Sequence, residues 1–328
     1  MSVETVPDPS ISDPGDAIVR VTKAGVCGSD MHIYNHGDAF GFHPGCRLGH
    51  ELVGVVEEVG AEVRSVAPGR KVASPFWISC GECHFCRKGL QTSCVRGGAY
   101  GFEPFWHGGG DVQGCQSEFV RVLPLTDVFT TAYHAVTGAD IHEGDTVLVV
   151  GDGAVGLLAC HAAQLRDPKA VVLAGHHDDR LEIGRGLGAT HALNTRNGDG
   201  LAALLADLTE GHGPEAVIDA VAGADSVKLA TETVQAGGTV SWVGMEVFLG
   251  PVEVAWDACF MRNLTIRGGV APVKRYLPEM FSLLEQGRID PSQVITQDLP
   301  LDEGPSGYSM MAERKPGVVK VAVSPGAG

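Results

Sequence analysis

The chain has 328 residues, which exceeds one ordinary hydrophobic core and predicts two domains. Its 24 basic and 40 acidic residues give a formal charge of −16, which repels phosphate backbones and anionic lipid headgroups and argues against nucleic acid and membranes as partners. The 45 glycines and the 44% apolar content are typical of an α/β enzyme. Because neither a signal peptide nor a bilayer-length apolar run is visible, we expect a cytoplasmic location.

The residue pattern changes near position 130. Before it, short β-rich runs at 17–24 and 52–60 alternate with clusters of Gly, Pro, Cys and His, as in antiparallel strands joined by functional loops. After it, apolar runs alternate mostly with helical stretches such as 155–165 and 201–210, which predicts a parallel sheet buried on both faces. The predicted strands of this sheet are 147–150, 171–173, 216–220, 239–243 and 264–268.

The last part of the chain contains an amphipathic helix near 274–286 and a closing apolar strand at 317–324. We expect both to return to the first domain rather than to extend the parallel sheet. The predicted boundaries are therefore 1–129 for the first domain, 130–267 for the second and 268–328 for the returning segment.

Four cysteines lie within fifteen residues, in the run CGECHFCRKGLQTSC, and predict a closed tetrahedral zinc site. They are Cys80, Cys83, Cys86 and Cys94. Disulfides are the alternative, but a reducing cytoplasm disfavours them. A zinc ion with four thiolate ligands has no open position, so it would contribute folding free energy of about 10 kcal/mol rather than catalysis.

The first strand of the predicted parallel sheet runs into a dinucleotide-binding turn, GDGAVG, followed by a helix. Gly151 allows the tight turn, Gly153 lets the backbone approach a pyrophosphate, and Gly156 permits close packing of helix and strand. The helix N-terminus, which starts near Ala154 and Val155, attracts the negative charge. A glycine turn without a ligand is the alternative interpretation.

The second predicted strand of the sheet ends at Gly175, and no carboxylate stands at its tip to accept the 2′-hydroxyl of NAD. Gly175 leaves room there, and His176 and Arg180 can meet a 2′-phosphate. This pattern favours NADP, with NAD as the alternative, although solvated loop residues would give the same pattern.

Cys27 and the pair His50-Glu51 suggest a second metal site, because a thiolate, an imidazole and a carboxylate stand near predicted strand ends. Taken singly, Cys27 is better explained as a small buried apolar side chain and His50 as a core histidine bonded to backbone. Cys46 is either a substitute ligand or an inert neighbour. The pair Phe105-Trp106 either lines a substrate pocket or belongs to a surface loop.

Together these motifs resemble the zinc-dependent alcohol dehydrogenases of the medium-chain dehydrogenase/reductase superfamily. GHELVG at 49–54 is similar to the family's GHE signature, Cys80 to Cys94 to its structural zinc lobe, and GDGAVG to its coenzyme turn. The resemblance implies a GroES-like, mostly-β catalytic domain that carries the lobe at 80–94, and a Rossmann domain with a doubly wound parallel sheet. It also implies two zinc ions per chain, a nicotinamide coenzyme, and a homodimer or homotetramer.

Carried over by position, the resemblance implies that Cys27, His50 and Asp127 hold the catalytic zinc, with Asp127 standing where many members have cysteine. Glu51 resembles the nearby carboxylate that can approach the metal. Asp30 resembles the acid that orients the histidine ligand through its other ring nitrogen.

The resemblance also implies a proton relay, in which the hydroxyl of Ser29 bonds the substrate alcohol and His32 passes the proton outward. Thr131 resembles a residue that lines the nicotinamide. The expected reaction interconverts an alcohol and an aldehyde or ketone by hydride transfer to or from NAD(P).

Two departures from the family pattern leave alternative functions open. The chain begins without the usual opening strand, and the segment between Val122 and Thr126 is short, although Asp127 follows it directly. The alternatives are a formaldehyde or polyol dehydrogenase of the same fold, or a shortened coenzyme-binding relative with little turnover.

Overall fold

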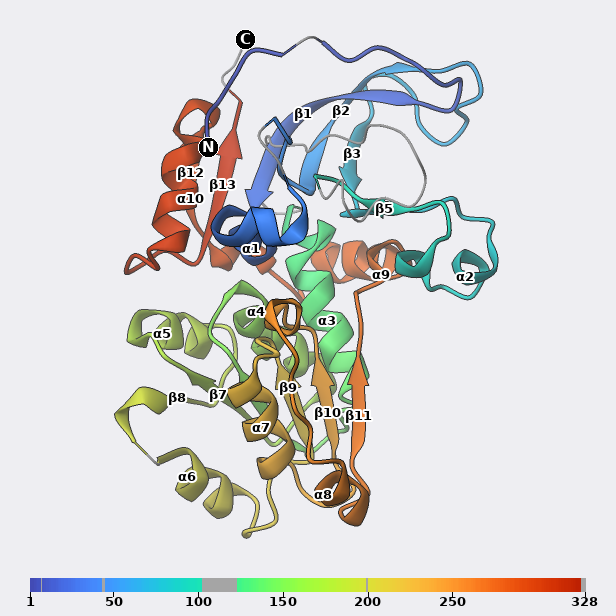
Figure 1. The fold of residues 1–328 in the computed structure, drawn as a ribbon. Helices are drawn as coiled ribbons and strands as arrows, with labels where there is room; N and C mark the ends of the chain where they lie inside the picture. The colour runs from blue at the N-terminus through green and yellow to red at the C-terminus, as the bar shows by residue number, and fades with distance from the viewer. Residues whose placement is uncertain (7, 43–44, 102–122, 199, 326–328) are drawn as a thin grey trace. The chain divides into compact units, whose positions relative to one another are not determined.

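The structure is a computed structural model that describes residues 1–6, 8–42, 45–101, 123–198 and 200–325. The pair Phe105-Trp106, whose role the sequence leaves open, lies outside these residues. The chain divides into two compact units (Figure 1). Unit 1 comprises Met1–Asp127 and Pro272–Gly328, and unit 2 comprises Val128–Ala271.

Unit 1 is built on a five-stranded sheet with the order β12-β13-β1-β2-β3. Strand β1 is antiparallel to both of its neighbours, β2 and β3 form a further antiparallel pair, and β12 runs parallel to β13. The strand bounds are Ala17–Val26 for β1, Glu51–Val59 for β2, Lys71–Ser74 for β3, Ile295–Pro300 for β12 and Lys320–Ser324 for β13. Segments from both ends of the chain therefore meet in one sheet (Figure 1).

The helices of unit 1 cover this sheet and carry several candidate site residues. Helix α10 packs on β13 and β1 through a core that includes Val26, Tyr308 and Val321. Helix α1 begins directly after β1, so its first residues lie at the end of the central strand. The helix bounds are Gly28–His36 for α1, His84–Arg87 for α2, Val273–Glu285 for α9 and Gly304–Ala312 for α10.

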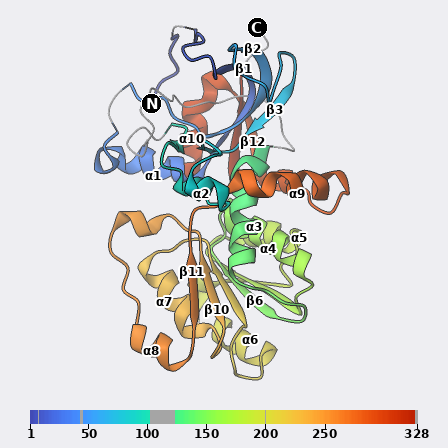
Figure 2. The ribbon, with the colours of Figure 1, turned by 90° about the vertical axis from the view of Figure 1, so that its right-hand side faces the viewer.

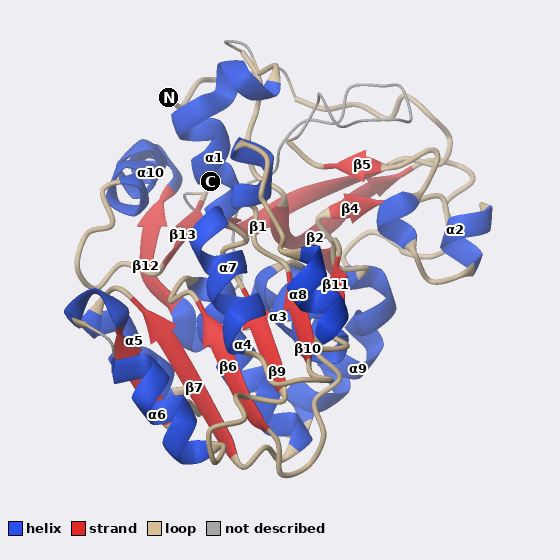
Figure 3. Cartoon of the chain, turned by 60° about the horizontal axis from the view of Figure 1, so that its bottom comes forward, coloured by secondary structure: helices blue, strands red, loops and turns tan. Residues whose placement is uncertain are grey.

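A two-stranded antiparallel ribbon frames the cysteine lobe within unit 1. It consists of β4 (Trp77–Ile78) and β5 (Gly98–Ala99). Between these strands the chain passes through α2 and the short 3-10 helix Gln91–Ser93 (Figure 3). The four clustered cysteines therefore belong to a single excursion of the chain.

Unit 2 is built on a six-stranded sheet in which every pair of neighbours is parallel (Figure 3). Its order, β11-β10-β9-β6-β7-β8, reverses direction between β6 and β9, as in the Rossmann fold. The strand bounds are Thr146–Val150 for β6, Ala170–Gly175 for β7, His191–Asn194 for β8, Ala216–Asp219 for β9, Thr239–Trp242 for β10 and Thr265–Gly268 for β11.

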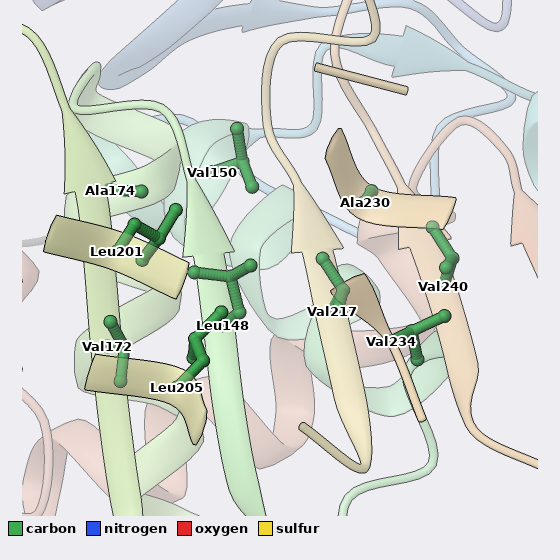
Figure 4. Packing of buried hydrophobic residues seen from close by; sticks show 10 residues of the cluster. All are labelled: Leu148, Val150, Val172, Ala174, Leu201, Leu205, Val217, Ala230, Val234 and Val240. Carbon is green, nitrogen blue, oxygen red and sulfur yellow. The ribbon is translucent and has the colours of Figure 1, made fainter. Parts of the chain in front are cut away.

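Helices cover both faces of this sheet, with α7 and α4 on opposite sides (Figure 2). One face packs alternate strand residues against α6 and α7, and its core comprises Leu148, Val150, Val172, Ala174, Leu201, Leu205, Val217, Ala230, Val234 and Val240 (Figure 4). Leu173, which points to the other face by the strand period of two, lies against Gly184 of α5. The helix bounds are Val128–Gly138 for α3, Ala154–Ala163 for α4, Asp178–Gly186 for α5, Gly200–Leu208 for α6, Ala224–Thr233 for α7 and Trp256–Met261 for α8.

This architecture, a mostly-β unit together with a unit built on a Rossmann-type parallel sheet, agrees with the predicted fold class. The five predicted strands of the parallel sheet are all present, whereas β3, β4, β5, β8 and β12 were not predicted. Among the residues that the structure describes, no helix has both the length and the apolar character needed to cross a bilayer.

Candidate metal and coenzyme sites

The four cysteines of the lobe bring their sulfur atoms within 4.8 Å of one another. Cys80 Sγ lies 4.0 Å from Cys86 Sγ, and backbone N–H groups point at three of the sulfurs. The N–H of Cys80 donates to Cys94 Sγ at 3.3 Å, that of Cys83 to Cys80 Sγ at 3.4 Å, and that of Cys86 to Cys83 Sγ at 3.5 Å. No disulfide forms among the cysteines in the described residues.

The lobe favours thiolates at some of these positions. Backbone N–H groups of Glu82 and Cys83 lower the pKa of Cys80 to about 6, and Arg96 contributes to the same effect. Burial raises the pKa of Cys86 to about 12. A cation that binds all four sulfurs would offset the cost of burying a Cys86 thiolate, since a thiol that coordinates a metal is deprotonated. Four sulfurs at this spacing fit a closed tetrahedral zinc site.

The second group of candidate ligands gathers at one end of the sheet of unit 1. Cys27 follows β1, His50 precedes β2, and Asp127 follows the 3-10 helix Leu123–Thr126. Asp127 Oδ2 lies 3.2 Å from Cys27 Sγ and 3.2 Å from His50 Nε2. These separations are close to the edge of a zinc coordination tetrahedron, which is about 3.4 Å for bonds of ordinary length. The short segment before Asp127 thus brings its carboxylate beside the other two donors.

Asp30 fixes the orientation of this group from helix α1. Its Oδ2 accepts the backbone N–H of Cys27 at 2.8 Å, and its Oδ1 lies 3.3 Å from His50 Nδ1. Asp30 is fully buried, so water does not compete for either contact. The imidazole of His50 therefore turns its Nε2 toward Cys27 and Asp127, as an acid paired with a ligating histidine would require.

The two residues expected in a proton relay also lie on α1. Ser29 Oγ is 3.3 Å from His50 Nε2, the nitrogen that faces the other donors. His32 stands one turn further along the same helix and is half-buried. Ser29 thus borders the place where the three candidate ligands converge. Cys46 belongs to neither group of clustered metal-binding donors in the described residues.

The charges of this second site favour a bound cation. Burial raises the pKa of the Cys27 thiol to about 11, and Asp127 adds to the effect. Burial opposes a charge on His50, but Asp30 and Asp127 outweigh it and raise the pKa of His50 well above its ordinary value. A thiol, an imidazole and a carboxylate enclosed together form a donor set that suits Zn²⁺. The residues present therefore fit the metal that the resemblance implies.

Glu51, the fourth residue of this cluster of possible metal ligands, is held by a partner that the sequence analysis did not predict. Its Oε1 accepts from Lys320 Nζ at 2.7 Å, and both side chains are almost fully buried. Burial raises the pKa of Glu51, while the Lys320 charge acts in the opposite direction. The sequence does contain a signal for this partner, since Lys320 is a lone lysine within the otherwise apolar closing strand. A lysine buried in such a strand needs a negatively charged partner.

The coenzyme turn has the backbone that its glycines predict. Gly151 has a φ of 107°, which is accessible to glycine but strained for other residues. A methyl group on Gly156 would overlap the carbonyl of Gly151, whereas one on Gly153 would enter open space. Helix α4 begins at Ala154 and continues through Val155, so its first N–H groups face the turn. Thr131 lies on α3 of the same unit.

Asp152, the second residue of that turn, reaches the end of β7 and was not predicted there. Its carboxylate accepts the N–H of His176 at 2.6 Å and that of His177 at 2.8 Å, and it also lies 3.0 Å from Nδ1 of His177. The guanidinium of Arg180 is 4.0 Å away. A side chain on Gly175 would collide with Asp152. A carboxylate therefore does lie at the end of β7, although it belongs to Asp152 of the coenzyme turn and not to β7 itself.

Comparison with known proteins identifies two family profiles along the chain. Residues 13–132 match the alcohol dehydrogenase GroES-like domain, and residues 154–286 match the zinc-binding dehydrogenase family. The first match covers the second candidate metal site and the cysteine lobe. The other begins within the coenzyme turn.

Full-length relatives agree with these profiles. The zinc-type alcohol dehydrogenase-like protein AdhB of Bacillus subtilis is 32% identical over 98% of this chain and 97% of its own. The NADP-dependent isopropanol dehydrogenase of Thermoanaerobacter brockii is 31% identical over 94% of this chain and 93% of its own. The solved structure of the alcohol dehydrogenase TADH from Thermus sp. ATN1 superposes with a TM-score of 0.88 at 34% identity, covering 99% of this chain and 96% of that one.

Proposed function

The chain belongs to the zinc-dependent alcohol dehydrogenases of the medium-chain dehydrogenase/reductase superfamily, and from this premise we propose that it interconverts an alcohol with an aldehyde or ketone. The nicotinamide coenzyme accepts or donates the hydride. The observation that carries the proposal is the mutual approach of Cys27, His50 and Asp127, with 3.2 Å from Asp127 to each of the other two and Ser29 alongside.

The proposal includes two zinc ions per chain. One is held by the four sulfurs of the cysteine lobe and stabilises the fold. The other is held by Cys27, His50 and Asp127, which leave one coordination position for substrate. When bound there, zinc supplies a Lewis acid that polarises the substrate oxygen and makes its proton easier to lose.

The residues of α1 carry the proton chemistry in this proposal. Ser29 would take up the proton of the alcohol and pass its own hydroxyl proton to His32, because its hydroxyl lies 3.3 Å from His50 Nε2 and so borders the place where the candidate ligands converge. His32, one turn further along, passes the proton to solvent. Asp30 keeps His50 in one orientation while this happens, through its 3.3 Å contact to Nδ1.

We further propose that the coenzyme is NADP, with NAD as the alternative. The 2′-phosphate would meet the exposed His176 and the guanidinium of Arg180 beyond the end of β7. Asp152 stands behind this turn, but its carboxylate is already bonded to two N–H groups and one imidazole. Its charge is therefore largely compensated, and it repels a phosphate less than a solvent-facing carboxylate would.

We propose that the chain assembles as a homodimer or homotetramer through unit 2. Helix α8 exposes three large apolar side chains, Trp256 at 65%, Phe260 at 80% and Met261 at 75% of their full area. The next strand, β11, is an edge of the six-stranded sheet and can pair with a second copy. Sedimentation of the wild type and of Phe260→Asp tests this, and a wild-type monomer would contradict it.

The activity is tested by following coenzyme absorbance with a panel of primary alcohols, secondary alcohols, polyols and formaldehyde adducts. We expect turnover with at least one class, and Cys27→Ser should abolish it. Metal analysis of the same preparations should give two zinc ions per wild-type chain and one in the variant. One zinc in the wild type, together with coenzyme binding but no turnover, would point instead to a coenzyme-binding relative.

A further inference from the structure

Glu51 and Lys320 meet across the central strand of the sheet of unit 1. Glu51 pairs in register with Gly25 on one edge of β1, and Ala322 pairs with Gly25 on the other edge. Lys320 stands two residues from Ala322, so the strand period of two puts all of these residues on one face. The 2.7 Å bond between Glu51 and Lys320 therefore spans β1 at the position of Gly25.

The glycine at this crossing is a spatial requirement. A methyl group on Gly25 would overlap Glu51 Oε2, so the carboxylate lies directly against the backbone of β1. Lys320 Nζ also donates to the carbonyl of Val26 at 3.2 Å, which fixes the ammonium at the same crossing. One carboxylate oxygen is thus packed on Gly25 while the other is bonded to Lys320.

The position of Glu51 matters because it is within reach of the proposed metal. Donor atoms of Cys27, His50, Glu51 and Asp127 all lie within 4.8 Å of one another. A tetrahedral zinc with four protein ligands is closed and structural, whereas a catalytic zinc keeps one position for substrate. The reaction proposed above therefore requires that Glu51 stay back from the metal while substrate binds.

We propose that Lys320, acting across Gly25, is a positioning residue that holds Glu51 off the metal and so keeps the fourth coordination position open. The inference rests on the proposed function, because it assumes a metal held by Cys27, His50 and Asp127. The physical reason is the cost of an unpaired buried carboxylate. If Lys320 is removed, the metal becomes the nearest cation that can satisfy Glu51, and the carboxylate closes the site.

The test uses the full-length protein with Co²⁺ in place of zinc, since cobalt reports its coordination through visible absorption. Imidazole is added as a probe for the open position. In the wild type, imidazole should change the spectrum of the second site, while the closed cysteine lobe stays silent. In Lys320→Met, with two cobalt ions retained, we expect the affinity for imidazole to fall at least about tenfold, within the range typical of groups that position metal ligands.

Three further variants test whether loss of the imidazole response comes from Glu51 closing the metal site. Lys320→Arg keeps the positive charge and should retain the imidazole response. The double variant Glu51→Gln/Lys320→Met should recover it, because an amide is a poor zinc ligand and no buried charge is left unpaired. Gly25→Ala displaces the carboxylate sterically with Lys320 in place, so it should lose the response and provides an independent route if Lys320→Met fails to fold.

The outcomes distinguish this inference from the proposed function. A Lys320→Met protein with full cobalt content and wild-type imidazole affinity would overturn the role of Lys320 while leaving the metal site intact. A wild-type protein with cobalt in the cysteine lobe alone would instead overturn the proposed function. Loss of the response in both Lys320→Met and the double variant would also count against the inference, since Glu51 could not then be the closing ligand.

Discussion

The carboxylate of Asp127 lies 3.2 Å from the sulfur of Cys27, although one hundred positions separate the two residues. The contact is made possible by the 3-10 helix Leu123–Thr126, whose four residues are all buried. Within it, the hydroxyl of Thr126 donates to the carbonyl of Leu123 at 2.7 Å and fixes the last turn before the acid. This short connection thus places the Asp127 carboxylate beside the Cys27 sulfur.

Asp127 should be replaceable by cysteine but not by asparagine. Both a carboxylate and a thiolate bind Zn²⁺, whereas a neutral amide leaves a buried thiol and imidazole without their anionic neighbour. We expect Asp127→Asn to contain one zinc per chain and to lose more than about 100-fold in turnover, and Asp127→Cys to retain two zinc ions. Metal analysis and steady-state kinetics check this, and two zinc ions in Asp127→Asn would contradict the assignment.

Asp30→Asn should weaken the same metal site without touching the metal. The amide can still contact Cys27 and His50, but it no longer stabilises positive charge on the imidazole and does not fix its tautomer. We expect zinc affinity at this site to fall about 10- to 100-fold. Competition with a chelator measures it. The zinc of the cysteine lobe serves as an internal control because its release rate should not change.

Cys86→Ser should remove the zinc of the lobe and destabilise unit 1. The other sulfurs would lose their common cation, and we expect the free energy of unfolding to fall by at least about 3 kcal/mol. Calorimetry and metal analysis of the full chain report the two effects. Cys46→Ser is the matched control, because Cys46 lies outside both clusters and its replacement should leave two zinc ions. An unchanged melting temperature in a zinc-depleted Cys86→Ser protein would refute the structural role.

Arg180→Ala should lower the affinity for NADPH more than the affinity for NADH. A guanidinium bonded to the 2′-phosphate contributes a charge-assisted interaction, so we expect the affinity for NADPH to fall about tenfold or more and that for NADH to change little. Titration calorimetry measures both. Arg185→Ala on the same helix is the control, since Arg185 is bonded to Glu182 and to the carbonyl of Ala192. Equal losses for both coenzymes would argue against a 2′-phosphate contact.

Asp152 should contribute stability that disappears in acid. Burial opposes its charge, but the N–H groups of His176 and His177 and the imidazole of His177 outweigh it and lower its pKa. Because the folded-state pKa lies below the unfolded value of about 3.9, the contribution is fully present above that pH. It is then lost as the pH falls through the folded-state pKa.

The comparison of wild type with Asp152→Asn tests this dependence. We expect a difference of about 1–2 kcal/mol in the free energy of unfolding near neutral pH, shrinking toward zero in acid below about pH 4. Denaturant titrations across this range provide the measurement. Glu143→Gln, which removes an exposed carboxylate of the same unit, is the control. A difference that grows in acid would show that the sign of this argument is wrong.

The sequence predicted the fold class because its strongest signals are local. In unit 2 the buried strands β6 and β7 are mostly continuous apolar runs, and the glycine turn after Val150 marks where the first strand meets a helix. Strand β8 escaped prediction because His191–Asn194 is short and only half-buried. Strand β12 was missed because Ile295–Pro300 is an edge strand in which Asp298 and Pro300 are exposed and no residue is fully buried.

The two unpredicted site residues depend on packing that a linear pattern does not contain. Asp152 occupies the variable position of the glycine turn, and only the adjacency of β6 and β7 brings its carboxylate to His176. Lys320 meets Glu51 because β1 lies between their strands. The roles predicted for Ser29 and the other members of the catalytic group stay predictions until the variants are measured.

The sheet order of unit 1 has a consequence for biosynthesis. Strand β1 is synthesised well before its partner on one edge, β13. Glu51 therefore has no ammonium beside it until β13 has been made and has joined the sheet. Folding of unit 1 must bring these two distant segments together before the Glu51–Lys320 pair can form.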